Sequence, residues 1–165
     1  MRRPAPLPAG PGQESVWDYP RPPRVERSDE LVEVRLGGRV VARSDRTLRV
    51  LETSHPPTYY LPEDAFAPGV LQPVEGRTYC EYKGVAAYFD LVADEVVAPR
   101  AAWTYPAPTA GFEQILGYVA VMPGAVDSCT VDGEMVRPQE GGFYGGWVTS
   151  RVVGPFKGGP GTWGW

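Results

Sequence analysis

Residues 51–91 read LETSHPPTYYLPEDAFAPGVLQPVEGRTYCEYKGVAAYFDL, and we expect the rest of the chain to be arranged around this stretch. It contains the only histidine, His55, one of the two cysteines, Cys80, and five of the nine tyrosines. Polar groups that can do chemistry therefore stand among aromatic side chains, which is the composition of a small-molecule pocket. The stretch predicts a site without naming the molecule that it binds.

The composition of the whole chain is that of a folded domain rich in turns. Of the 165 residues, 42% are hydrophobic and 22% are charged, which suffices for a packed core. The 20 glycines and 19 prolines are interleaved with short apolar runs, so we predict short strands joined by tight turns. The length indicates one domain. We assign residues 1–14 to a flexible Pro-rich N-terminus and residues 15–165 to a single domain with an aromatic C-terminal tail at 138–165.

Charge and cysteine content exclude several classes of function. The net charge of −4 and the pI near 5.1 argue against a nucleic-acid partner. No apolar run approaches the roughly 20 residues of a membrane span, and residues 1–12 lack the apolar segment of a secretory signal. We expect a cytoplasmic protein with Cys80 and Cys129 reduced. Two cysteines and one histidine cannot form a CxxC-type zinc site, so we expect no metal and no cofactor.

The pattern of the chain is mainly β with one short helix. Gly37-Gly38 separates two alternating segments and predicts a hairpin, as does Asp132-Gly133. The best helix candidate is TAGFEQIL at residues 109–116, which Thr109 could cap. Strands are predicted at 30–35, 40–41, 46–51, 58–61, 77–82, 86–92, 96–98, 101–105, 118–122 and 128–136.

Both terminal segments carry large aromatic rings among prolines and glycines. In residues 14–24, Trp17 and Tyr19 could anchor an extended arm on the domain surface, or the arm could close over a pocket or a neighbouring subunit. The tail at 138–165 holds three of the five tryptophans. These rings could pack into the same domain or form a homodimer contact, because so aromatic a segment has to be buried somewhere.

Several uncommon sequence motifs in the chain resemble those of one family. TSHPPTYYLPEDA (53–65), TYCEYKG..AYFDL (78–91) and AAWTYPAPTAGFEQILGYVAVMPGAVD (101–127) are similar to the family called domain of unknown function 427, DUF427. VWDYPRPPR (16–24) and GGFYGGW with GPFKGGPGTWGW, at 141–147 and 154–165, resemble the flanks of one branch. The resemblance covers about Ser15 to Trp165. It implies a mainly antiparallel, twisted two-sheet domain of the β-tent group, which includes methionine sulfoxide reductase B and the thalidomide-binding domain of cereblon.

The resemblance implies no activity, although an older label for the family is nucleotidyltransferase-like. Nucleotidyl transfer uses a Gly-rich phosphate loop and carboxylates that hold magnesium. GGFYGG is rich in glycine, but no helix beginning with Lys-Ser or Lys-Thr follows it. The paired acids Glu63 and Asp64 are adjacent in sequence and point different ways. The residues therefore do not favour this chemistry.

Cys80, His55 and Lys83 are the candidate catalytic residues. Cys80 could act as a nucleophile if the Lys83 ammonium lowers its pKa, or it could be a small buried hydrophobic group. His55 could shuttle protons and form a nucleophile–base pair with Cys80, or it could fix the His-Pro-Pro bend through a backbone hydrogen bond. Lys83 could bind an anionic ligand, or Lys83-Gly84 could be a turn whose glycine has a positive φ angle.

Six aromatic side chains are candidates for the walls of the pocket, although aromatic strand residues also form ordinary cores. They are Tyr59, Tyr60, Tyr82, Tyr88, Trp103 and Tyr105. Three functions remain open. The first is a domain that binds a small molecule without chemistry, the second is a small enzyme that uses Cys80, and the third is a structural protein that buries its aromatic tail against a partner.

Overall fold

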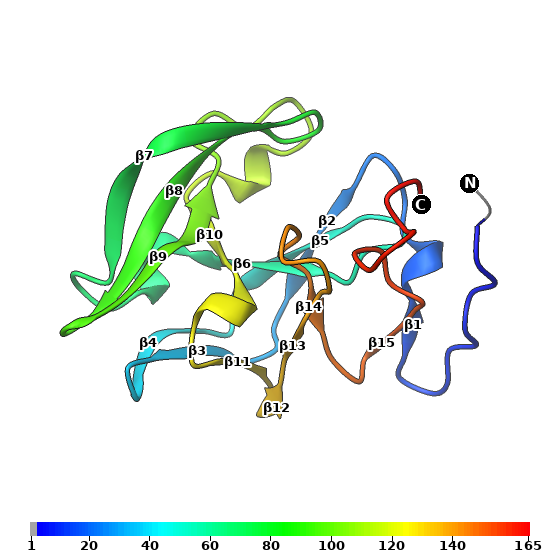
Figure 1. The fold of residues 1–165 in the computed structure, drawn as a ribbon, viewed down its shortest axis with the longest axis horizontal. Helices are drawn as coiled ribbons and strands as arrows, with labels where there is room; N and C mark the ends of the chain where they lie inside the picture. The colour runs from blue at the N-terminus through cyan, green and yellow to red at the C-terminus, as the bar shows by residue number, and fades with distance from the viewer. Residues whose placement is uncertain (1–2) are drawn as a thin grey trace.

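The computed structural model describes residues 3–165 and has a mainly β fold built from two principal sheets (Figure 1). The larger sheet has seven antiparallel strands in the order β2, β5, β6, β10, β9, β8, β7. Their bounds are Arg24–Ser28 (β2), Thr47–Leu51 (β5), Thr58–Pro62 (β6), Leu71–Cys80 (β7), Gly84–Ala93 (β8), Val96–Thr104 (β9) and Tyr118–Val121 (β10). The mainly β, antiparallel two-sheet fold expected from the sequence is confirmed.

The smaller sheet has four antiparallel strands in the order β12, β11, β3, β4. Both predicted hairpin turns lie in it. Gly37, Gly38, Asp132 and Gly133 all have positive φ angles, which two-residue hairpin loops require. The strands span Val32–Leu36 (β3), Arg39–Ser44 (β4), Ser128–Val131 (β11) and Glu134–Met135 (β12).

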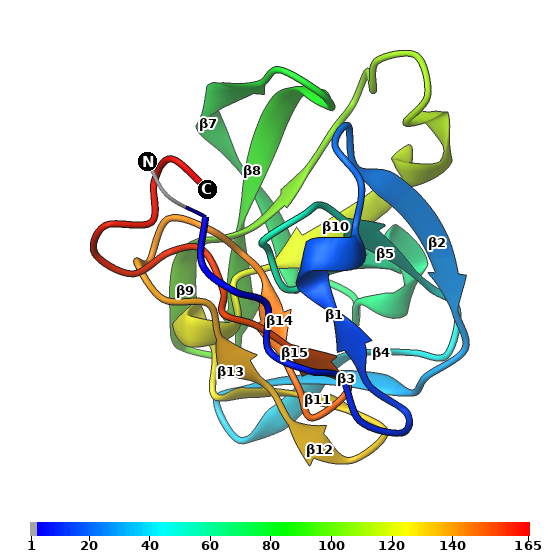
Figure 2. The same cartoon turned by 90° about the vertical axis from the view of Figure 1, so that its right-hand side faces the viewer.

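Two short strand pairs join the terminal segments to the sheets. β1 (Glu14–Ser15) pairs in parallel with β15 (Val152–Val153), and the two strands lie side by side in Figure 2. β13 (Arg137–Pro138) pairs with β14 (Trp147–Val148). The N-terminal segment thus lies along the C-terminal tail. Met1 and Arg2, part of the predicted flexible segment 1–14, lie outside the described residues.

The helical content of residues 3–165 is limited to short 3₁₀ turns, and none of their helices is long and apolar enough to cross a membrane. The eight-residue helix predicted at 109–116 is reduced to one turn, because Gly111 has a φ of 93° and Thr109 has other partners. The Thr109 hydroxyl donates to the Tyr82 carbonyl, and its amide donates to the Lys83 carbonyl at 3.1 Å. The turns are η1 (Val16–Asp18), η2 (Glu63–Ala65), η3 (Glu113–Ile115) and η4 (Pro123–Ala125).

The main hydrophobic core fills the space between the two sheets. Trp147 enters it from β14 and is fully buried, with its indole N–H donating to the Val121 carbonyl at 3.1 Å. Its ring stacks on Tyr59 at a centroid distance of 5.0 Å. Other core residues include Val32, Val34, Val41, Leu61, Leu91, Ala102, Val119, Cys129 and Val131.

The N-terminal arm is held by a cluster of charges around one buried arginine, and not by its rings alone. Arg49 of β5 is fully buried and donates to Glu14 and to Glu26, the latter at 2.9 Å. The Tyr19 hydroxyl donates to Glu14 at 2.6 Å. Burial alone would raise the pKa of Glu14, but the hydrogen bonds from Arg49 and Tyr19 outweigh it and lower the pKa to about 2. This cluster fixes the arm to the domain's own large sheet.

The strands β7, β8 and β9 curl away from the rest of the large sheet (Figure 1). Their register shifts between Val74 and Arg77 and between Phe89 and Leu91. An extra residue in one strand bends the strand and increases its twist. The sheet face that does not meet the small sheet is therefore concave.

Candidate functional site

The floor of the candidate site is one cross-strand row on the concave face of the large sheet. Tyr60 of β6 is paired with Ala120 of β10, Ala120 with Trp103 of β9, and Trp103 with Tyr88 of β8. Directly opposed residues in a sheet project to the same face. The register thus places three aromatic rings side by side around one small residue.

A pocket of about 400 Å³ lies on this floor, within the size range of small-molecule sites. It draws on segments that are far apart in sequence, from the bend after β5 to the C-terminal tail. Its principal lining residues are Glu52, His55, Pro56, Tyr60, Thr78, Cys80, Glu81, Tyr82, Lys83, Tyr88, Arg100, Trp103, Tyr105, Gln139, Phe143, Tyr144, Gly145 and Lys157.

Eight of the nine predicted site residues line this one pocket. They are His55, Cys80, Lys83, Tyr60, Tyr82, Tyr88, Trp103 and Tyr105. Tyr59 does not line it. Because side chains alternate along β6, Tyr59 points to the opposite face, where it packs on Trp147 and donates to Glu30 at 2.9 Å. Tyr59 is therefore a core residue, and its pocket-facing neighbour is Tyr60.

A buried glutamine fixes the orientation and the tautomer of His55. The Gln139 side-chain oxygen accepts from the Gly146 amide at 3.1 Å, and its nitrogen donates to the Lys157 carbonyl at 2.6 Å. The same nitrogen lies 3.1 Å from His55 Nδ1. Since an amide nitrogen can only donate, Nδ1 accepts, and the ring proton resides on Nε2. This histidine presents a hydrogen-bond donor to the pocket.

The surroundings of His55 keep its ring neutral. Burial lowers the pKa of His55 to about 4; Glu52 opposes this shift, while the charges of Lys157, Arg21 and Lys83 add to it. The His55 ring also meets the Tyr144 ring edge to face, with centroids 4.9 Å apart. At neutral pH the imidazole therefore adds no positive charge to the site.

Cys80 lies at the end of β7, half-buried against the aromatic cluster. Among the described residues, no hydrogen bond joins its sulfur to His55, whose Nδ1 is occupied by Gln139. Cys129 is the other free thiol, and burial in the main core raises its pKa to about 12. The two thiols thus differ in their access to solvent and to the pocket.

The β7–β8 hairpin tip places Lys83 at the edge of the pocket. Gly84 has a φ of 106°, as predicted for the Lys83-Gly84 turn. Thr109 anchors this tip through the Tyr82 and Lys83 carbonyls. The Lys83 ammonium then lies 5.7 Å from the centre of the Tyr105 ring, which is cation–π distance.

The C-terminal segment contributes to the wall of the pocket, a position that local sequence patterns do not predict. Gln139, Phe143, Tyr144, Gly145 and Lys157 all line the site. A Cβ atom on Gly145 would overlap the Trp103 ring, so only glycine allows this close approach. In the sequence, the aromatic pair between two glycine pairs in GGFYGG is the feature that could have indicated that this segment lines the pocket.

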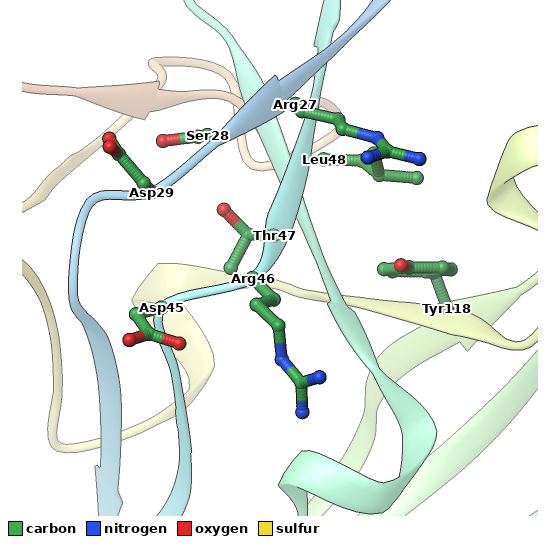
Figure 3. Close-up of a pocket in the computed structure, with 8 residues that line it drawn as sticks. All are labelled: Arg27, Ser28, Asp29, Asp45, Arg46, Thr47, Leu48 and Tyr118. Atoms are coloured by element: carbon green, nitrogen blue, oxygen red, sulfur yellow. The ribbon is translucent and has the colours of Figure 1, made fainter.

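A second hollow, of about 580 Å³, lies at one end of β2 and β5 (Figure 3). In Figure 3 the carboxylates of Asp29 and Asp45 lie on one side of it, and Arg27 and Tyr118 lie on the other. Its two aspartates and two arginines balance in charge and are all exposed. None of the predicted site residues lines it. We therefore place the candidate site in the smaller, aromatic pocket.

Metal chemistry finds no support in the arrangement of the side chains. Within residues 3–165, no group of three or more His, Cys, Asp or Glu side chains is placed to hold a metal ion. The histidine in the pocket has one nitrogen occupied by Gln139. What the pocket offers is aromatic surface, hydrogen-bond donors and positive charge.

The fold and the pocket define an all-β domain with an aromatic hollow on the free face of its large sheet. The chain belongs to the family described as domain of unknown function (DUF427), whose model matches residues 24–132. A search of curated proteins found no match. The matched region includes His55, Cys80, Lys83 and the aromatic floor, whereas the covering residues from Gln139 to Lys157 lie beyond it.

Proposed function

We propose that this protein binds a small molecule with a flat apolar part in the pocket on the concave face of its large sheet. The observation that carries the proposal is the cross-strand row of Tyr60, Trp103 and Tyr88 beneath a hollow of about 400 Å³. Aromatic faces favour offset stacking with planar groups. The hollow has the dimensions of a ligand site, and the polar groups at its rim could orient the ligand.

The hydrogen-bond network around the pocket supports binding by a preformed site. Gln139 is buried and bonded to Gly146, Lys157 and His55, so the rim is ordered before any ligand arrives. Preorganised groups lose less conformational entropy on binding.

The proposed location of the protein is the cytoplasm. Both cysteines are free, which supports a reducing compartment.

Binding can be tested with a panel of metabolites and small aromatic compounds by saturation-transfer NMR, followed by calorimetry on each compound that binds. Trp103→Leu removes the centre of the floor. Trp163→Leu is the matched control, because Trp163 is 79% exposed and does not line the pocket. We expect Trp103→Leu to raise the Kd by about tenfold or more and Trp163→Leu to change it by less than about twofold. Binding that survives Trp103→Leu unchanged would overturn the proposal.

Catalysis by Cys80 stays a prediction, with a separate test. The rate of alkylation of Cys80 by iodoacetamide can be followed against pH, with buried Cys129 as the internal control. Fast alkylation with an apparent pKa well below about 8.5 would favour the enzyme hypothesis. Slow alkylation at both thiols would favour binding without chemistry.

A further inference from the structure

The chain places its lysines very unevenly. Of its 16 basic residues apart from histidine, only Lys83 and Lys157 are lysines, and both line the aromatic pocket. Arg100, at the open side of the pocket, is a third cation. The positive charge of the pocket therefore comes from three residues on separate segments of a protein with a net charge of −4.

None of these three cations forms a salt bridge with an Asp or Glu side chain of the described residues. The Arg100 guanidinium donates to the Glu75 carbonyl at 2.7 Å, and the Lys157 ammonium donates to the main-chain oxygen of Trp165 at 3.4 Å. Salt bridges within residues 3–165 involve Arg21, Arg24, Arg39, Arg49 and Arg151, but not Lys83, Arg100 or Lys157. The pocket also contains Glu52, which is bonded to Arg21 at 3.0 Å, and the exposed Glu81. The three positive charges on the pocket walls are therefore not paired with acidic side chains among the described residues.

Each of the three cations lies over an aromatic ring of the same pocket. The Lys83 ammonium is 5.7 Å from the centre of the Tyr105 ring, and the Arg100 guanidinium carbon is 4.2 Å from that of Tyr88. The Lys157 ammonium is 5.7 Å from the centre of the Tyr144 ring. One face of each of these rings therefore already lies against a cation of the protein itself. A cationic ligand on those faces would have to displace these cations and would meet like charge.

We propose that the ligand of this pocket is a planar molecule that carries an anionic group, which Lys83 and Lys157 bind while its flat part stacks on the aromatic floor. The proposal rests on the proposed function and specifies its ligand class. An ammonium group beside a carboxylate or phosphate forms a charge-assisted hydrogen bond, which is stronger than a neutral one. His55, neutral with its proton on Nε2, can add a donor without adding charge.

The test compares four probes that share one ring system: 2-naphthoate, 2-naphthyl phosphate, neutral 2-naphthamide and 2-naphthylmethylammonium. Their Kd values are measured by calorimetry with the full chain. We expect both anions to bind at least about tenfold more tightly than the amide and the ammonium probe to bind most weakly. The order of the two anions distinguishes a carboxylate ligand from a phosphate ligand. Salt should weaken the binding of both anions.

Two charge-matched double variants test whether the preference for anions comes from the pocket lysines. Lys83→Gln/Lys157→Gln removes both pocket lysines, and Arg39→Gln/Arg43→Gln removes two positive charges from exposed positions on β4 that do not line the pocket. The first should raise the Kd of the tighter anion by about tenfold or more, and the second should change it by less than about twofold. Near-native circular dichroism of both variants shows that they fold.

The outcomes separate the two proposals. If 2-naphthamide or the ammonium probe binds as tightly as the anions and Trp103→Leu weakens that binding, the pocket stands and its anion preference is overturned. Anion binding that the lysine variant leaves unchanged also overturns the preference. If no probe or panel compound shows binding that depends on Trp103, the proposed function itself fails.

Discussion

The two faces of the large sheet carry similar residues, but one face forms core and the other forms the pocket. The neighbours Tyr59 and Tyr60 illustrate this difference. Tyr59 faces the small sheet, is 1% exposed, and stacks on the buried Trp147. Tyr60 is equally buried but faces the concave side, in the row that leads to the half-buried Trp103. One face is closed by a second sheet. The other is covered by the η3 segment, whose Phe112 and Ile115 pack in one cluster with Tyr60, and beside the pocket by a glycine-rich loop. What covers a face, rather than its own composition, decides whether it becomes core or pocket.

The largest expected difference between the faces is in stability. Trp147→Ala leaves a large cavity in the main core and the Val121 carbonyl without its donor, so we expect a loss of about 3–5 kcal/mol in the free energy of unfolding. Trp103→Ala, on the open face, should cost about 2 kcal/mol or less, because water can enter the enlarged pocket. Urea unfolding measures both variants. Equal costs would mean that the two faces are packed alike.

The pocket side should also carry a pH dependence that the core side lacks. The unfolded chain protonates His55 near pH 6.5, whereas the folded protein protonates it only near pH 4. Stability from the neutral ring is thus fully present above pH 6.5 and is lost as the pH falls to 4, by about 3 kcal/mol. His55→Asn keeps an acceptor for Gln139 but cannot titrate. Urea unfolding from pH 7 to 4 should show a shallower decline for this variant, and parallel curves would contradict the burial of a neutral His55.

A smaller effect should come from the loop that covers the pocket. In Gly145→Ala the new methyl group would meet the Trp103 ring, so the loop must move or Trp103 must turn. We expect a loss of about 1–3 kcal/mol together with weaker ligand binding. Gly124→Ala is the matched control, because its added methyl group would make only ordinary contacts, the nearest 3.6 Å away at Pro138. Thermal unfolding and probe titration measure both; a harmless Gly145→Ala would mean that the loop does not press on the floor.

The smallest expected effect is on the core face. Tyr59→Phe keeps the stacking on Trp147 but removes the hydroxyl that donates to Glu30. Glu30 retains Ser28 and Arg151 as donors, so the loss should be about 1 kcal/mol, with ligand affinity unchanged. Urea unfolding and calorimetry with the tightest-binding naphthalene probe measure these two quantities. A change in affinity would place Tyr59 in contact with the ligand after all.

Local patterns in the sequence predicted the strands and hairpins, because glycine pairs and alternation act over a few residues. They did not decide the fate of Tyr59, since alternation separates it from Tyr60 without saying which face a second sheet will cover. Residues 109–116 have a helical pattern, but the partners of Thr109 at the β7–β8 tip are 26 and 27 residues away. Such contacts become visible only when the tertiary fold is known.

Local sequence patterns could not predict which residues cover the pocket either, because those residues are far apart in sequence. Gln139 meets His55 across 84 residues of sequence, and nothing near either residue indicates the contact. A count over the whole chain would have helped, because the two lysines and the only histidine all line one pocket. Rare residue types that gather in space are a signal that strand patterns do not contain.

The central claim, that the concave face and not the core or the terminal surface receives the ligand, is tested most directly by ¹⁹F NMR on protein labelled with 5-fluorotryptophan. Its five tryptophans report on separate places and can be assigned with single Trp→Phe variants. On titration with the tightest-binding naphthalene probe, we predict that the Trp103 resonance shifts most, while those of Trp147 and Trp163 stay in place. Saturable shifts at Trp163 or Trp17 with an unmoved Trp103 would contradict the account.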